Sequence, residues 1–147
     1  MKVSVSIPEW HQMAVNGCAP PVRILLHGNS MFPLIRMKRD YVTIVQLDQK
    51  LVKGDIVLFY SPQTGKYVVH RIWETRDGRV LTWGDHCSDP DPWILGDNVW
   101  GRVSLIERGR RQIKPNATKG LKWAGFWHKV GKVYRKLGKI WNGIIGR

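Results

Sequence analysis

Cysteine is scarce in this chain of 147 residues, which has only Cys18 and Cys87. Two cysteines cannot build a disulfide-rich scaffold, and they are too few for a closed zinc site made of thiolates. We therefore expect free thiols in a reducing compartment, and the sequence predicts no metal site and no cofactor. The length still fits one domain that buries a core without covalent staples.

Long apolar runs are missing as well. No stretch reaches the roughly 18 apolar residues that cross a bilayer. The N-terminus also has no apolar core of a secretory signal. Together these absences predict a cytoplasmic protein. With 43% hydrophobic and 24% charged residues, the composition is that of a globular protein, and disorder throughout is excluded.

Acidic residues are outnumbered, with 11 Asp and Glu against 24 Lys and Arg, so the formal net charge is +13. The excess is uneven, because residues 119–147 hold eight Lys or Arg and no acidic residue. A basic tail of this kind is typical of segments that lie on anionic membranes as well as of nucleic-acid binding. No nucleic-acid motif accompanies the charge, so nucleic acid is not the expected partner.

Residues 1–113 are predicted to form a mainly β domain of hairpins. β-branched and aromatic residues fill runs at 22–26, 41–45, 55–60, 67–73, 79–83 and 99–106. Asp77-Gly78 predicts a two-residue hairpin turn, because both central positions of such a turn need positive φ. Alternation over residues 3–7 predicts a further edge strand that ends at Pro8, and residues 84–98 are expected to be a loop.

Residues 114–118 are expected to link this domain to an amphipathic helix over 119–147. Apolar side chains recur every seven residues in three rows that make one stripe, here called the apolar stripe. Its members are Trp123, Phe126, Trp127, Val130, Val133, Tyr134, Leu137, Ile140, Trp141 and Ile144. Six glycines weaken this helix by about 1 kcal/mol each relative to alanine, so we expect it to form where a surface stabilises it.

The apolar stripe has two interpretations. In the first, the helix lies on an anionic membrane, with aromatic side chains in the interface and lysines attracted to the lipid. The residues of this predicted membrane contact are Trp123, Trp127, Trp141, Lys122, Lys129 and Lys136. In the second, the stripe packs on the β domain or on a partner helix. The sequence leaves both open.

Ser30 and His70 are the residues best suited to chemistry. Ser30 lies in a glycine-flanked loop after a predicted strand, and its hydroxyl becomes a nucleophile only when a base takes its proton. His70 is a candidate base, because imidazole titrates near neutral pH. Residues 84–92 carry three carboxylates that could orient the imidazole, cap turns or hold a divalent cation weakly. The plainer alternatives are a solvated loop serine and a structural histidine.

Five segments of the chain are informative when taken together, namely residues 28–33, 53–57, 69–72, 84–92 and 99–103. In their order and spacing they resemble the type I signal peptidase family, and the resemblance covers roughly residues 22–107. The histidine at position 70 resembles the archaeal and endoplasmic-reticulum branch, whereas the bacterial branch and the related LexA-type peptidases have lysine there.

The resemblance implies a serine endopeptidase with a signal-peptidase/LexA-like β domain. Ser30 would be the nucleophile and the oxyanion donor through its N–H, and His70 the general base. Asp91 matches the carboxylate most closely tied to activity, and Asp85 the supporting one. Met31 and Pro33 would shape the loop and the edge of the substrate groove.

The resemblance further implies a substrate bound as an extended strand along an open sheet edge, with small side chains near the cut. The expected substrate is therefore a precursor or leader peptide, cleaved after a small residue. The chain departs from the family at His86 and Cys87, where asparagines are usual, and in having no transmembrane anchor. The alternative function is a non-catalytic peptide-binding domain that its basic helix tethers to a membrane.

Overall fold

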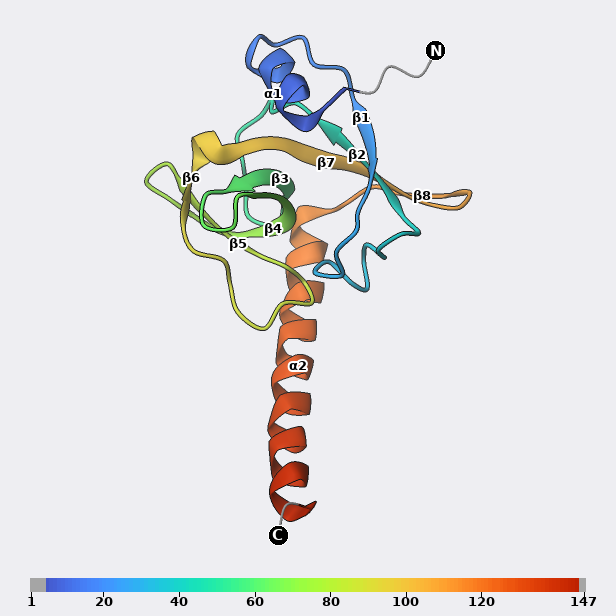
Figure 1. The fold of residues 1–147 in the computed structure, drawn as a ribbon, viewed down its shortest axis with the longest axis vertical. Helices are drawn as coiled ribbons and strands as arrows, with labels where there is room; N and C mark the ends of the chain where they lie inside the picture. The colour runs from blue at the N-terminus through green and yellow to red at the C-terminus, as the bar shows by residue number, and fades with distance from the viewer. Residues whose placement is uncertain (1–4, 146–147) are drawn as a thin grey trace.

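The computed structural model describes residues 5–145, and within them eight strands form one antiparallel sheet (Figure 1). The order is β1-β2-β7-β3-β4-β5-β6, and β8 pairs with β7. The mainly β class with a C-terminal helix is confirmed. The elements are α1 (Ile7–Val15), β1 (Val22–Leu25), β2 (Tyr41–Val45), β3 (Ile56–Ser61), β4 (Lys66–Arg76), β5 (Arg79–Trp83), β6 (Ile94–Leu95), the short helix η1 (Gly96–Asn98), β7 (Val99–Arg108), β8 (Arg111–Ile113) and α2 (Ala117–Ile145).

The N-terminal segment is a helix rather than the strand predicted over residues 3–7. Residues 3 and 4 lie outside the described part, Val5 and Ser6 are not in a strand, and α1 begins at Ile7. The Ser6 hydroxyl accepts the Glu9 N–H, while the Glu9 carboxylate accepts the Ser6 N–H at 2.8 Å. This capping box satisfies free N–H groups at the helix start, which the alternating pattern could not reveal.

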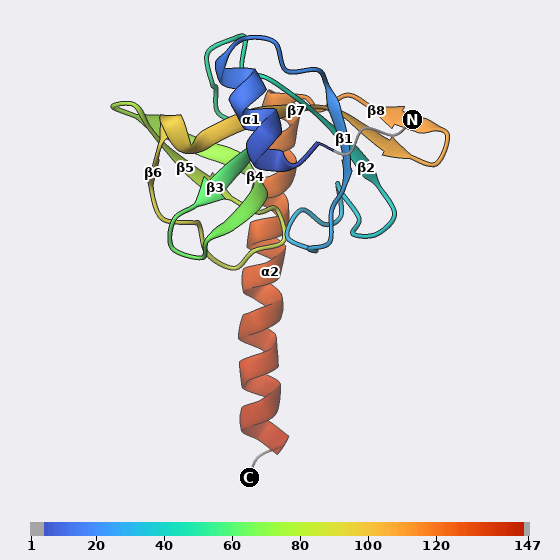
Figure 2. The same ribbon diagram turned by 45° about the horizontal axis from the view of Figure 1, so that its top comes forward.

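The central strand β3 is buried on both faces, and a separate hydrophobic cluster lies on each. Leu58 belongs to one cluster with Trp10, Val42 and Ile106, whereas Val57 and Phe59 belong to the other. Figure 2 shows the sheet curling around this strand, with α1 across one end. The two clusters therefore fix β3 and its neighbour β4, whose residues carry the candidate site.

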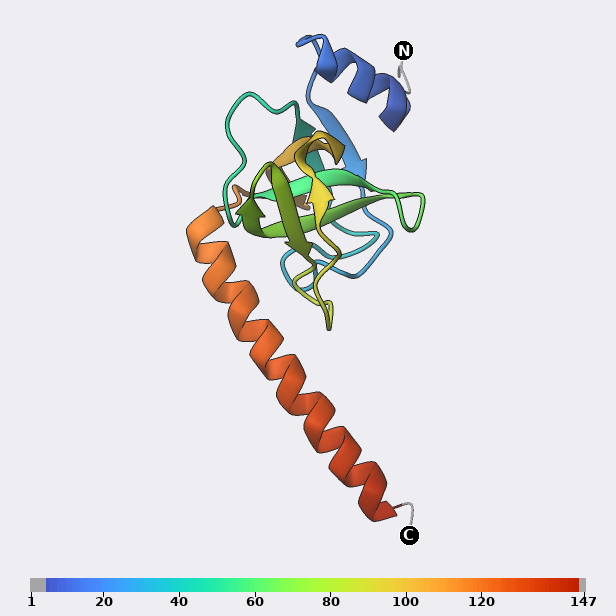
Figure 3. The same ribbon diagram turned by 90° about the vertical axis from the view of Figure 1, so that its left-hand side faces the viewer.

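The turn between β4 and β5 forms as predicted, since Asp77 and Gly78 have φ of 49° and 72°. Helix α2 begins at Ala117, inside the segment expected to be a linker, and its far half extends away from the sheet (Figure 3). None of the described helices is both long enough and apolar enough to cross a membrane.

Helix α2 packs on the sheet through a face that is not the apolar stripe. Ala124 and His128 are buried, and each comes one residue after a stripe residue, which places it about 100° further round the helix. Trp127 and Val130 are half-buried, but Trp123 and Trp141 remain 47% and 64% exposed. Packing of the whole stripe on the β domain is therefore wrong.

Candidate active site

His70, in the middle of β4, forms a hydrogen-bonded pair with Asp91. Strand β4 carries His70, and its Nδ1 lies 2.5 Å from Asp91 Oδ2. The same carboxylate oxygen accepts the Thr82 hydroxyl at 2.7 Å, and the Asp91 N–H donates to the Thr82 carbonyl at 2.8 Å. Strand β5 therefore holds Asp91 by side chain and backbone, with its carboxylate directed at the imidazole.

This environment changes the pKa of His70. Burial of the ring lowers the pKa, but the hydrogen bond and charge of Asp91, together with the nearby Cys87 thiol, outweigh burial. The net result raises the pKa of His70 from 6.5 to about 9. A carboxylate at Nδ1 also fixes the ring orientation and leaves Nε2 to face the groove.

Gly84 allows three functional groups to approach one another on the Nε2 side of the ring. A Cβ at this position would lie 2.7 Å from the Ser30 carbonyl oxygen, 3.0 Å from His70 Nε2 and 2.5 Å from Cys87 Sγ. Any side chain here would separate the serine loop from the histidine. The structure thus brings the backbone carbonyl of Ser30 close to His70.

The Ser30 side chain itself makes no hydrogen bond to His70 within residues 5–145. Instead, the Cys87 thiol lies 4.0 Å from His70 Nε2. The Ser30 carbonyl accepts the His86 N–H at 2.8 Å, so the serine loop and the loop after β5 are joined directly. The sequence did not single out Cys87 as a neighbour of the histidine, because that contact depends on the fold.

Ser30, His70, Cys87 and Asp91 all line a groove of about 800 Å³. Its walls come from the end of β1 and the residues that follow it, and from the hairpin of β3 and β4. Within the described residues β1 pairs with β2 alone, so its other edge is unpaired. The groove can therefore accommodate an extended segment beside an open strand edge.

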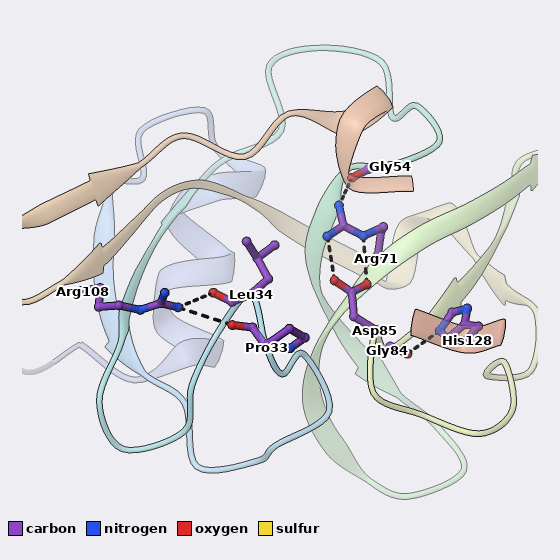
Figure 4. A network of polar contacts seen from close by, with 8 residues as sticks. All are labelled: Pro33, Leu34, Gly54, Arg71, Gly84, Asp85, Arg108 and His128. Atoms are coloured by element: carbon purple, nitrogen blue, oxygen red, sulfur yellow. Dashed lines mark hydrogen bonds and ion pairs between the residues drawn. The ribbon is translucent and has the colours of Figure 1, made fainter. Parts of the chain in front are cut away.

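The loop that follows Ser30 is clamped from β7. Arg108 donates to the carbonyls of Leu34 and Pro33, at 2.9 Å and 3.5 Å (Figure 4). It also donates to the buried Asp40 carboxylate. Met31 is 1% exposed and packs in the core cluster, so it holds the loop against the core. Contrary to the prediction, it does not line the groove. Pro33 is half-buried in this loop.

Asp85 contacts an arginine rather than the histidine. Arg71 donates from Nε and Nη2 to the two Asp85 oxygens at 2.9 Å and 2.8 Å, and from Nη1 to the Gly54 carbonyl at 3.0 Å (Figure 4). Both side chains are fully buried. Asp85 therefore fixes the start of the loop that carries Cys87 and Asp91.

The residues predicted for membrane contact lie on α2. Trp123, Trp141 and the three lysines are exposed, whereas Trp127 is half-buried and its indole N–H is enclosed without a partner in the described residues. The three lysines, which flank the apolar stripe on the side away from the packed face, are Lys122, Lys129 and Lys136.

Among the described residues, no cluster of three His, Cys, Asp or Glu side chains is arranged to hold a metal ion. In comparisons with known proteins, no family model matches the chain, and no curated protein matches it.

Proposed function

We propose that the chain is a serine endopeptidase that resembles signal peptidase I and cleaves a precursor or leader peptide after a small residue. The observation that carries the proposal is the His70 imidazole, which Asp91 orients and which faces the same groove as Ser30. The close approach of both residues at Gly84 supports it further.

In the proposed reaction, neutral His70 takes the proton of the Ser30 hydroxyl while the Ser30 oxygen attacks the scissile carbonyl. The Ser30 N–H stabilises the oxyanion, and the resulting imidazolium is stabilised by Asp91. His70 then returns the proton to the leaving amine, and an acyl-enzyme on Ser30 remains for water to hydrolyse. Turning the Ser30 hydroxyl toward Nε2, in place of the Cys87 thiol, completes the arrangement.

The substrate would bind as a strand beside the unpaired edge of β1. The expected small side chain next to the cut is what the resemblance to signal peptidases implies.

The proposal is tested with a mixture of synthetic peptides and mass-spectrometric mapping of the cut sites. The full chain should cleave after small residues, and both Ser30→Ala and His70→Ala should lower the rate by about 10³-fold or more. Ser104→Ala, whose hydroxyl lies on β7 and bonds the Thr43 carbonyl, is the matched control and should cleave normally. Equal cleavage rates for the Ser30→Ala variant and the wild-type chain would refute the mechanism.

We also propose that α2 attaches the protein to anionic membrane through the apolar stripe. The stripe is exposed along the free half of the helix, and lysines flank it, as in helices that lie in the interface. Binding to phosphatidylglycerol vesicles should exceed binding to phosphatidylcholine vesicles. The double change Leu137→Ser and Trp141→Ser should weaken binding by about tenfold or more, while exposed Asn142→Ser should not.

A non-catalytic peptide-binding domain remains the second candidate. The observation in its favour is that His70 Nε2 contacts Cys87, with no hydrogen bond to the Ser30 side chain in the described residues. This candidate predicts that peptides bind in the groove but stay intact. The cleavage experiment separates the two functions directly, because binding without cleavage supports only the second.

A further inference from the structure

The loop of residues 84–91 carries two side chains that lie on the nitrogens of His70, those of Cys87 and Asp91. The Ser30 carbonyl and Thr82 hold its backbone at the two ends. Between them, the Cys87 N–H donates to the Gly84 carbonyl at 3.0 Å, and the Cys87 carbonyl accepts the Trp83 indole N–H at 3.0 Å. Residues 88–90 are exposed, so further contacts from a neighbouring element make opening of this loop less favourable.

Helix α2 supplies contacts to this loop near its start. His128 is buried, and its Nε2–H donates to the Gly84 carbonyl at 3.0 Å (Figure 4). The ring stacks on Trp83, with centroids 3.8 Å apart and planes 17° apart, and meets Trp73 edge-on. His128 is thus fixed in position by β4 and β5 before it reaches Gly84.

Two further contacts of α2 with the site lie before and after His128 along the helix. Gly120 packs against the Arg71 guanidinium that holds Asp85, so closely that a Cβ would lie 2.2 Å from Arg71 Nη1. About two turns beyond His128, Arg135 donates to the Ser88 hydroxyl at 3.2 Å. The helix therefore touches the loop, or the side chain that anchors it, along its whole docked half.

We propose that α2 is a brace of the candidate active site and that His128 is its positioning residue. By holding Gly84, the helix keeps Asp91 on one nitrogen of His70 and the Cys87 and Ser30 groups near the other. The apolar stripe lies on a different face of the same helix, so membrane contact and bracing do not compete for side chains. The term active site in this inference rests on the proposed function, whereas the labelling and titration tests below do not depend on peptidase activity.

The first test measures loop opening without any substrate. In a Cys18→Ser background, the rate at which N-ethylmaleimide labels Cys87 reports access to the loop. His128→Phe keeps the stacked ring but removes the N–H, and labelling should rise by about tenfold, the effect of one lost hydrogen bond to a buried carbonyl. His128→Gln keeps a donor near the position of Nε2 and should restore most of the protection.

A glycine pair provides the second test. Gly120→Ala places a methyl group against the Arg71 guanidinium, which three hydrogen bonds fix, and should increase labelling by about tenfold or more. Gly138→Ala is the matched control, since no atom lies within 4 Å of its Cβ, and it should leave labelling unchanged. Circular dichroism on each variant reports whether the sheet is retained.

The NMR titration of His70 gives a readout that general destabilisation would not produce. If the brace holds Asp91 in place, His128→Phe should move the His70 midpoint from about 9 toward 6.5 in the folded chain, whereas Gly138→Ala should not. Unchanged labelling and titration in both His128→Phe and Gly120→Ala would overturn the brace. If the labelling rate and the His70 midpoint change in these variants while the wild-type chain cleaves no peptide, the brace is supported and the peptidase proposal fails.

Discussion

Two adjacent residues of β4 each pair with an aspartate from one loop, but the two pairs differ in access to solvent. Arg71 and Asp85 are fully buried on one face of the strand, and the arginine makes three hydrogen bonds. His70 faces the groove on the other face, and its partner Asp91 has a side chain that is 27% exposed. Neighbouring strand residues point to opposite faces, so one step along the chain separates them.

The difference shows that an ion pair alone does not define a functional site. The Arg71–Asp85 pair is enclosed and permanently charged, because guanidinium keeps its proton. The His70–Asp91 pair can gain and lose a proton and has space beside Nε2 for a reacting group. Under the proposed function, the enclosed Arg71–Asp85 pair stabilises the fold, and the accessible, titratable His70–Asp91 pair takes part in the reaction.

The largest expected effect separates the two pairs by activity. Asp91→Asn should lower kcat/KM by about 10³- to 10⁴-fold, because the amide no longer stabilises the imidazolium or holds the reactive tautomer. Above pH 9, where the charged His70–Asp91 pair no longer stabilises the fold, the melting temperature should change little, since Thr82 can still bond the amide oxygen. Steady-state kinetics on a cleaved peptide and a thermal melt measure both. A loss of folding without a specific loss of rate would contradict the distinction.

The next effect appears in stability. Asp85→Asn leaves the Arg71 charge buried without its counter-ion and should lower the free energy of unfolding by about 3–5 kcal/mol. Urea unfolding followed by tryptophan fluorescence measures this loss. If Asp85→Asn unfolds in the same urea range as Asp91→Asn, the Arg71–Asp85 pair is not the structural one.

The pH dependence of activity should follow His70. A general base acts when neutral, so with a pKa of about 9 the value of kcat/KM should rise about tenfold per pH unit between pH 7 and 8 and level off above 9. The midpoint of an unperturbed histidine would lie near 6.5 instead. A flat profile between pH 6 and 9 would exclude His70 as the base.

The same raised pKa affects folding. The folded chain holds the His70 proton more tightly than the unfolded chain, so this stabilisation is complete below about pH 6.5. It decreases as the pH rises and is lost above about 9. The free energy of unfolding, measured in urea from pH 6 to 10, should therefore fall across this window. The fall should be absent in Asp91→Asn, where the charge that holds the proton is gone.

The smallest effect is expected for a third ion pair on β4. Lys53 and Glu74 lie 2.9 Å apart, but both side chains are largely solvated. Lys53→Ala should leave the urea midpoint of unfolding almost unchanged, because water screens an exposed pair. An effect near that of Asp85→Asn would show that solvent exposure does not rank these pairs.

Local signals predicted the strands and the hairpin turn. The β-branched runs and Asp77-Gly78 depend on a few neighbouring residues, and β2 and β5 form over the residues expected. The chain is helical from Ile7 because Ser6 and Glu9 cap α1, a signal that the alternation of residues 3–7 does not contain. The pairing of β8 with β7 was not foreseen, since its strand of three residues is too short to show a pattern.

The partners in the candidate site could not be read from spacing. Three aspartates lie within a few residues, and only the turn of the loop decides which one reaches His70 and which reaches Arg71. The docked face of α2 was missed for another reason. Its contacts use Gly120, Ala124 and His128, which add almost nothing to a hydrophobic pattern that the aromatic stripe dominates.

The exposed apolar stripe has a practical consequence for handling the purified protein. In the free half of α2, an apolar surface is exposed to water by the side chains of Leu137, Ile140 and Trp141. Surfaces of this kind associate with one another when no other cover is provided. At high concentration the purified protein should therefore self-associate and adsorb to plastic, and mild detergent or lipid nanodiscs should prevent this association.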